Sequence, residues 1–590
     1  MKERKYYTDE RNIQILISLL KQSGIRKVVA SPGATNVSFV GSLQNDPFFE
    51  MYSCVDERSA AYIAVGLAAE SGEPVVISCT GATSSRNYMP ALTEAYYRKL
   101  PILAVTSTQD ERRIGHMIAQ VTDRSVKPND VIVHAEHVPT CTDEIAEWDA
   151  TIRLNRAILA LTQHGGGPVH INLATVYSRN FTVKELPIAR KISRFTAIDT
   201  LPVIPKGRIA IFVGSHVAWS NDLTVAVDKF CSKYNAVVFC DHSSNYKSNF
   251  RVCNAIVGTQ AIYSSPIYNI DLLLHIGEIS GDYAGFRVSR AKQVWRINED
   301  GELRDQFRKL TNVFEMREVD FFRYYTADVN ETVTTNSYLE ECQDEYKRFQ
   351  ALVPELPFSN LWIAQHSADM LPANSVLHLG ILNSLRAWNM FEIPQSVSSY
   401  VNTGGFGIDG CMSTCLGGAL AQPNKMHYLV IGDLAYFYDL NAMGNRHMNG
   451  NMRILLVNNG KGTEFRNYNH CAAEFGDDAD KYMAAGGHFG NKSGLLVKHI
   501  SEDLGFEYRS ASSKEEYLAL REWFFTPPSL LNNVKPLLLE VFTTNQDESD
   551  ALYAINHLIS DSKTVIKHKV KEVTKKVLPQ SAIDKLKKLT

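Results

Sequence analysis

Short apolar runs alternate with helix-forming segments along most of the chain, and this alternation constrains the fold more than any other feature. Runs such as 75–78, 209–213 and 428–431 are almost free of charged residues. Strands buried in parallel sheets have this pattern, because helices cover both faces of such sheets. The alternation therefore predicts an α/β fold built from doubly wound parallel sheets.

The apolar runs fall into three blocks, which are separated by polar or proline-bearing segments. We predict domains at 1–186, 207–345 and 355–548, followed by a tail at 549–590. At roughly 100–200 residues per domain, a chain of 590 residues has room for three such units.

The tail is rich in lysine, and its apolar residues Ile566, Val570, Val573 and Val577 have helical spacing. We expect an amphipathic helix that lies on the protein's own surface or on a partner subunit. Contact with an anionic membrane surface is the alternative.

The composition excludes several classes of protein. A formal net charge of -3 argues against a nucleic-acid binder, which usually has a basic surplus. The ten cysteines are scattered, and no His or Cys cluster of the zinc type is visible in the sequence. The N-terminus has no apolar leader, and no long apolar run predicts a membrane span. These features predict a cytoplasmic protein.

Two polar segments follow neighbouring apolar runs of the third block. Gly432-Asp433 follows the run at 428–431, and Asn458-Asn459 ends the run at 454–457. Carboxylate and amide oxygens at two strand ends suit Mg²⁺, which is often shared with phosphate oxygens. A helix starting near Ala435 would direct its N-terminal amides at those phosphates. Alone, either segment could be a helix cap or a turn, but together they predict a metal and phosphate site.

This pair of segments resembles the signature of thiamine-diphosphate enzymes of the acetolactate synthase and pyruvate decarboxylase group. The resemblance implies that Asp433, Asn459 and the main-chain carbonyl of Lys461 bind Mg²⁺. It also implies a diphosphate site that includes Gly432 and Leu434. Leu434 departs from the family's usual Gly-Asp-Gly.

A second segment, Asp56-Glu57-Arg58, supports the same family, because it lies between a predicted strand and an alanine-rich helix. Glu57 could be an ordinary first-turn acid. The resemblance makes it the glutamate that binds N1′ of the cofactor's aminopyrimidine and assists proton transfer. Thr80 and Asn87 are expected to line the pyrimidine site. The family's active site lies between subunits, which implies a homodimer or a homotetramer and the order pyrimidine-binding, central and diphosphate-binding domain.

Within the family, the chain is most similar to the synthases of menaquinone biosynthesis that add a decarboxylated 2-oxoglutarate unit to isochorismate (SEPHCHC synthases). The resemblance makes Gln120 an active-site glutamine, Ser384 a cofactor contact and Ile408 the apolar residue that bends the cofactor. His116, near Gln120, is a candidate acid or base. The motifs that carry this similarity are Ser31-Pro32-Gly33, Asn383-Ser384-Leu385, Gly407-Ile408-Asp409-Gly410 and Asp439-Leu440-Asn441.

The chain departs from this branch at four positions where the synthases have substrate-binding arginines. Non-cationic residues stand there: Ala34, Gln109, Trp388 and Thr403. Arg386 could compensate for part of this loss. Loss of four guanidinium groups predicts different substrates, because each binds a carboxylate with defined geometry.

We therefore expect a thiamine-diphosphate- and Mg²⁺-dependent carboligase. It would decarboxylate a 2-oxo acid and transfer the acyl carbanion to an aldehyde or ketone acceptor, and a specialised pathway such as one for unusual surface sugars is the expected setting. The alternatives are a simple 2-oxo acid decarboxylase, a SEPHCHC synthase and a catalytically silent family member. FAD is not expected in the central domain.

Overall fold

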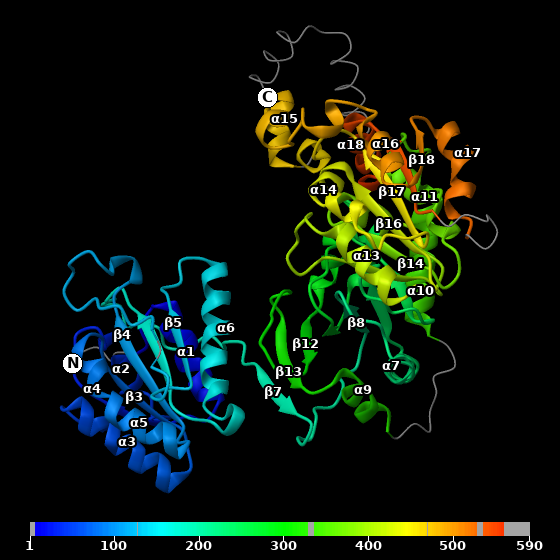
Figure 1. Cartoon of the computed structure of the whole chain (residues 1–590). Coiled ribbons are helices and arrows are strands. Elements are labelled where there is room, and N and C mark those ends of the chain that lie inside the picture. Colours follow the sequence, from blue (N-terminus) through cyan, green and yellow to red (C-terminus); the bar gives the residue numbers. More distant parts are fainter. Residues whose placement is uncertain (1–5, 127, 328–335, 469, 528–534, 560–590) are drawn as a thin grey trace, which may run out of the picture. The chain divides into compact units, whose positions relative to one another are not determined.

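The computed structural model describes residues 6–126, 128–327, 336–468, 470–527 and 535–559 (Figure 1). The chain forms two compact units, Met1–Asp199 with Gly301–Glu315, and Thr200–Asp300 with Met316–Thr590. The lysine-rich part of the tail, from 560 onward, lies outside the described residues.

The first unit contains a six-stranded parallel sheet with the order β2-β1-β3-β4-β6-β5. The strands are β1 (Lys27–Ala30), β2 (Glu50–Ser53), β3 (Val75–Thr80), β4 (Ile102–Thr108), β5 (His134–Val138) and β6 (Val169–Ala174). The helices are α1 (Arg11–Gln22), α2 (Val37–Leu43), α3 (Glu57–Ser71), α4 (Thr83–Asn87), α5 (Met89–Arg98) and α6 (Glu144–Ala160).

Successive side chains of β1 serve two different cores of this unit. Val28 packs into a core with residues of α1 and α6, whereas Val29 packs into a core with residues of α3 and α5. Helices therefore cover both faces of the sheet, as Figure 1 shows.

The second unit contains a six-stranded parallel sheet with the order β15-β14-β16-β17-β19-β18. The strands are β14 (Val376–Leu379), β15 (Ser398–Val401), β16 (His427–Gly432), β17 (Met452–Asn458), β18 (Glu507–Ala511) and β19 (Leu537–Phe542). The helices around it are α11 (Asn360–Gln365), α12 (Asn383–Trp388), α13 (Cys411–Ala421), α14 (Asp433–Tyr438), α15 (Ala479–Tyr482), α16 (Leu496–Asp503), α17 (Lys514–Phe525) and α18 (Asn545–Asn556).

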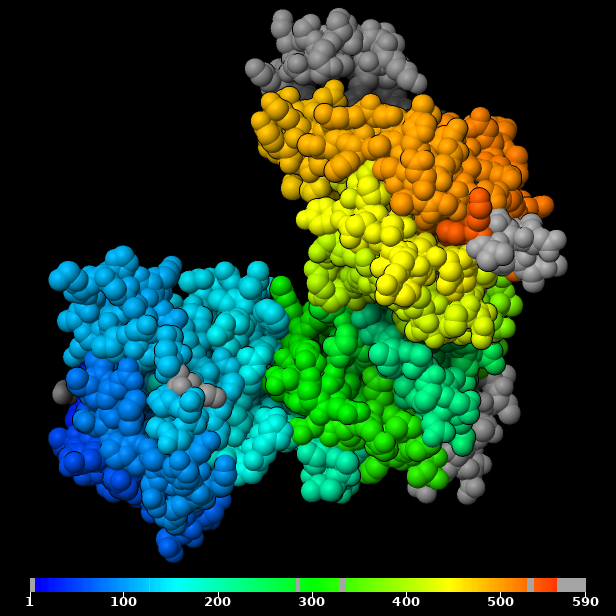
Figure 2. All heavy atoms as spheres, viewed as in Figure 1, coloured from blue at the N-terminus to red at the C-terminus, as the bar shows by residue number. Residues whose placement is uncertain are grey.

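Both faces of this sheet are also covered. Leu429 and Ile431 of β16 pack in one core with α13, α14 and α16. Tyr428, on the other face, stacks on Phe525 of α17. In Figure 2 the segment that follows β17 (orange) covers one end of this unit.

A seven-stranded sheet has the order β10-β9-β8-β11-β12-β13-β7. The strands are β7 (Ser193–Thr196), β8 (Ile209–Val213), β9 (Val237–Cys240), β10 (Arg251–Cys253), β11 (Leu272–Ile276), β12 (Gln293–Asn298) and β13 (Leu310–Glu315). Its longer helices are α7 (Asn221–Tyr234), α9 (Glu318–Thr326) and α10 (Ser337–Leu352). The predicted fold class, three parallel-sheet α/β domains, is confirmed.

Candidate functional site

The sheet of the second unit has a switch point between β14 and β16. The chain runs from β14 to β15 on one side, and then returns to β16 on the other side. The loops after β14 and β16 therefore leave the sheet in opposite directions and open a crevice between them, where α/β folds bind ligands. Asp433 follows β16 directly, so the sheet topology places this carboxylate at the crevice.

A cavity of about 120 Å³ lies at this switch point. The loops that follow β14, β15, β16 and β17 line it, together with residues of α11 and α18. The lining residues are Asn360, Ile381, Leu382, Asn383, Ser384, Ile408, Gly432, Asp433, Leu434, Ala435, Val457, Asn459, Lys461, Gly462, Thr463, Glu464, Phe465 and Glu548. The cavity thus brings together all the residues of the third block that the sequence assigned to a cofactor and metal.

Asp433 is almost completely buried, with 5% of its surface exposed. Burial raises the pKa of its carboxyl group to about 7, and hydrogen bonds from the backbone amides of Leu434 and Gly460 act in the opposite direction. Helix α14 begins at Asp433 itself rather than near Ala435, because Gly432 is still extended and caps the helix. A buried carboxylate without a partner cation is unfavourable, so this position suits a metal ion.

Asn459 supplies the second oxygen. Its Oδ1 is buried and has no hydrogen-bond partner among the described residues, while its Nδ2 donates to Thr463 Oγ1 at 3.5 Å. The side chain of Lys461 is in an ion pair with Asp480, so only its main chain could serve the metal. A buried carboxylate and an unpaired buried amide oxygen are hard donors of the kind that Mg²⁺ binds. The residues present therefore fit a magnesium diphosphate.

Leu434, the departure from the family motif, lies against the loop after β17. A Cβ atom at Gly462 would be only 3.3 Å from Leu434 Cδ1. The bulky residue at 434 and the glycine at 462 thus fit each other, and the two loops that hold the oxygen donors touch through an apolar contact.

The other predicted contacts of this domain also line the cavity. Ser384 Oγ accepts a hydrogen bond from Asn360 Nδ2 at 3.4 Å, and Asn383 Nδ2 donates to Thr463 Oγ1 at 2.8 Å. Ile408 is partly buried and packs against the core beside α13. Leu382 has a φ of 73° where the loop after β14 turns into α12, a strained conformation of the kind that collects at functional sites.

In the first unit, Glu57 is the first residue of α3, which Asp56 caps by accepting a hydrogen bond from the amide of Ser59. Glu57 Oε2 accepts a hydrogen bond from Asn87 Nδ2 at 3.2 Å. Thr80 ends β3 and bonds to Thr35. The structure therefore joins two of the predicted pyrimidine-site residues directly.

Gln120 and His116 lie in the loop between β4 and β5, and both are exposed. Gln120 has a φ of 64°, which is unusual for a side chain other than glycine. Within the described part of the first unit, neither side chain bonds to Glu57, so the structure does not bring these two residues to the pyrimidine contact.

The positions of the missing arginines differ in their surroundings. Trp388 is completely buried in α12, and Thr403 is 3% exposed. Gln109 bonds to Arg113. Arg386, the suggested compensating cation, forms an ion pair with Glu464 at 2.5 Å. Its charge is therefore balanced within the protein, which weakens its role as a substrate cation.

Comparison with known proteins agrees with this geometry. Residues 12–126 match the family described as thiamine pyrophosphate enzyme, N-terminal TPP binding domain. The first domain thus matches the TPP-binding domain of thiamine-diphosphate-dependent enzymes, and the chain is similar to these enzymes. The matched residues include Glu57, Thr80 and Asn87.

Relatives span almost the whole enzyme. The 2-succinyl-5-enolpyruvyl-6-hydroxy-3-cyclohexene-1-carboxylate synthase of Bacteroides fragilis is 29% identical over 94% of this chain and 100% of its own. The same synthase of Bacteroides thetaiotaomicron is 29% identical over 93% of this chain and 99% of its own. The similarity to SEPHCHC synthases predicted from the sequence is thereby confirmed.

A solved structure, the Rhodococcus jostii RHA1 thiamine diphosphate-dependent 4-hydroxybenzoylformate decarboxylase, matches 90% of this chain and 99% of its own at 15% identity. Its TM-score of 0.37 is too low to add to the argument. In the described part of the enzyme, no helix is long and apolar enough to cross a membrane.

Several residues at the cavity were not predicted from the sequence, among them Asn360, Thr463 and Glu548. Thr463 lies four positions after Asn459 in the same loop, so proximity alone could have indicated it. Asn360 and Glu548 carry no local signal, because α11 and α18 meet only in the fold, where the Asn360 amide donates to Glu548 at 3.0 Å.

Proposed function

We propose that this enzyme uses thiamine diphosphate and Mg²⁺ to decarboxylate a 2-oxo acid and to transfer the resulting acyl carbanion to an aldehyde or ketone acceptor. The observation that carries the proposal is the pair of buried oxygen donors at the switch point, Asp433 and the Oδ1 of Asn459, which no described residue pairs. Retention of Glu57 and its partner Asn87 in the other unit supports an active enzyme over a silent family member.

The roles of the residues follow from their positions. Asp433, Asn459 and the carbonyl of Lys461 would bind Mg²⁺ and thereby hold the diphosphate. Glu57 Oε2 would share a proton with N1′ of the aminopyrimidine, and Asn87 would orient the Glu57 carboxyl group. Thiamine diphosphate supplies the electron sink that makes loss of CO₂ from a 2-oxo acid feasible. Ile408 would support the bent cofactor from the cavity wall.

The substrates are proposed to differ from those of SEPHCHC synthases. Trp388 is buried, and Arg386 is paired with Glu464, so neither offers an unbalanced cation to a dicarboxylate. A 2-oxo acid with a single carboxylate, of which pyruvate is the simplest, matches this reduced positive charge.

The test is CO₂ release from a panel of 2-oxo acids, with and without Mg²⁺, thiamine diphosphate and aldehyde acceptors. We expect release to need both cofactors, and the acceptor to be converted into a hydroxyketone. Release without a coupled product indicates a simple decarboxylase. Turnover of 2-oxoglutarate with isochorismate indicates a SEPHCHC synthase, and no cofactor-dependent release with any acid refutes the proposal.

We also propose that the active site is shared between two subunits of a homodimer. Glu57→Gln and Asp433→Asn are each expected to abolish turnover. If each site takes Glu57 from one subunit and Asp433 from the other, co-expression of the two variants restores about a quarter of the wild-type activity, because half of the dimers then hold one intact site. No restored activity in verified mixed dimers contradicts the shared site.

A further inference from the structure

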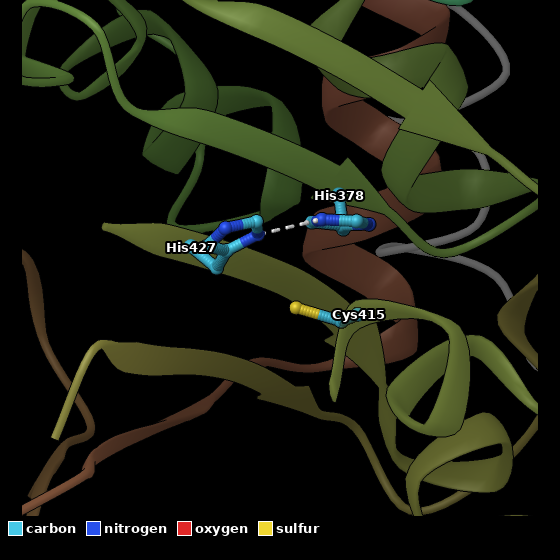
Figure 3. A group of neighbouring side chains, drawn as sticks. All are labelled: His378, Cys415 and His427. Atoms are coloured by element: carbon cyan, nitrogen blue, oxygen red, sulfur yellow. Dashed lines mark hydrogen bonds between the residues drawn. The ribbon is translucent and has the colours of Figure 1, made fainter. Parts of the chain in front are cut away.

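Three side chains with metal-binding atoms meet inside the second unit, away from the cofactor cavity. They are His378 of β14, His427 of β16 and Cys415 of α13, and their ligand atoms all lie within 4.8 Å of one another. In Figure 3 the two rings face each other and the sulfur of Cys415 points toward them. No zinc-type cluster was expected from the sequence, because the three residues belong to three separate elements.

The cluster is closed to solvent. His378 is 5% exposed, His427 1% and Cys415 0%. Burial lowers the pKa of His378 to about 3 and that of His427 to about 4, so both rings are neutral at pH 7. Neutral imidazole is the form that binds metals.

The hydrogen bonds inside the cluster leave it incomplete. His378 Nε2 lies 3.1 Å from His427 Nδ1, so one ring donates to the other. No hydrogen bond of the Cys415 thiol is found in the described residues, and the two ring nitrogens beside it share a single hydrogen bond. A buried thiol without a partner next to these nitrogens leaves lone pairs that a further ligand could use.

The backbone of α13 passes close to the two rings at Gly418. A Cβ atom at Gly418, one turn after Cys415, would lie 3.1 Å from His378 Cε1 and 3.2 Å from His378 Nε2. Glycine at this position lets α13 approach the two rings closely. The backbone carbonyl of Gln422 interacts with the His427 ring and favours a proton on the nitrogen that faces away from His378.

We propose that His378 Nε2, His427 Nδ1 and Cys415 Sγ bind a thiophilic transition-metal ion, for which zinc is the first candidate. Two imidazoles and a thiolate are a soft donor set that selects such ions over magnesium. Zinc lies about 2.0 Å from nitrogen and about 2.3 Å from sulfur, so its ligand atoms are on the order of 3.5 Å apart. The two ring nitrogens here are 3.1 Å apart and all the ligand atoms lie within 4.8 Å, so binding requires shifts of about 1 Å. On binding, the metal–sulfur bond replaces the S–H bond, and the thiol proton goes to solvent.

This site would be structural and distinct from the cofactor site. His427 begins β16 and Asp433 follows its end, so about 20 Å of strand separates them at about 3.3 Å per residue. A metal ion here would join α13 to β14 and β16. It would thereby fix the start of α13, which follows the segment that carries Ile408.

The experiment uses the full-length protein, prepared without metal and then titrated with Co²⁺ in the presence of excess Mg²⁺ and thiamine diphosphate. We expect about one equivalent of Co²⁺ to bind with a thiolate-to-cobalt charge-transfer band, and zinc to displace it. Elemental analysis of protein purified without chelators is expected to show zinc or copper in a near one-to-one ratio. Zinc is also expected to raise the unfolding temperature, because it binds only the folded state.

Variants separate this site from others. Cys415→Ser and His427→Gln are expected to lose the band, whereas Cys411→Ser, which changes a buried cysteine one turn earlier, and Asp433→Asn retain it. Wild-type protein without a stoichiometric metal or a charge-transfer band overturns the proposal, whether or not the variants fold. A band that survives in folded Cys415→Ser overturns it as well.

Discussion

Glu548 is a buried carboxyl group whose titration should be measurable as a change in stability. It lies in α18 and lines the cofactor cavity, and no cation pairs with it among the described residues. Its Oε1 accepts hydrogen bonds from the Asn360 amide at 3.0 Å and from Thr543 Oγ1 at 2.8 Å. The perturbation is Glu548→Gln, because a glutamine Oε1 can keep both of these bonds while the charge is removed.

The magnitude follows from the shift in pKa. Burial raises the pKa of Glu548 from 4.5 to about 7, so the folded state binds the proton more tightly than the unfolded state. The stability that this group contributes is present in full below about pH 4.5 and is lost as the pH rises through about 7. Between about pH 5 and pH 8 the wild-type protein should lose about 2–3 kcal/mol that the Gln variant retains.

The assay is urea unfolding of both cofactor-free proteins at these two pH values, followed by circular dichroism. Replacing the second carboxyl oxygen by an amide nitrogen costs the same free energy at both pH values. The difference in unfolding free energy between variant and wild type therefore changes with pH only because Glu548 titrates. We expect Glu548→Gln to gain stability relative to wild type at the higher pH. The reasoning would be refuted if the difference in unfolding free energy stayed constant between the two pH values, or if wild type gained stability relative to the variant as the pH rose.

Three further predictions concern the proposed metal site, the proposed pyrimidine site and the close packing after strand β8. Asn459→Ala should leave the fold intact but weaken Mg²⁺-dependent thiamine diphosphate binding by tenfold or more, measured by calorimetry; unchanged affinity would exclude Asn459 as a metal ligand. Glu57→Gln should bind the cofactor yet lose about 10²–10⁴-fold in turnover, and full turnover would remove its assigned proton-transfer role. Gly214→Ala should destabilise the second unit by several kcal/mol, because the new Cβ would lie 1.8 Å from the Glu278 carbonyl oxygen; an unchanged urea midpoint would contradict this close approach.

The strands were predictable because their physics is local. Residues 75–77 and 428–431 are apolar on both faces, and this pattern is typical of strands covered on both sides. The approach of Asp433 to Asn459 was predictable for a related reason. Asp433 follows the apolar run that forms β16, and Asn459 follows the run that forms β17. These two strands are adjacent in the sheet.

Other features depend on tertiary contacts and left no local trace. The bond between Asn360 and Glu548 joins helices at the two ends of the domain's sequence. The ion pair between Arg386 and Glu464 likewise depends on how two loops pack. Nothing in the linear pattern around His378 or Cys415 marks them as neighbours, because α13 has to fold over the sheet to bring them together.

The contact between Leu434 and Gly462 restricts how this sequence can evolve. A return to the family's Gly-Asp-Gly would remove the Leu434 side chain and leave a void beside Gly462. A Cβ atom at 462 would lie 3.3 Å from Leu434 Cδ1 and 3.1 Å from Phe465 Cδ2, so a side chain there would press on both neighbours. Leu434 therefore favours glycine at 462, and Phe465 would still disfavour a larger residue there if Leu434 were replaced.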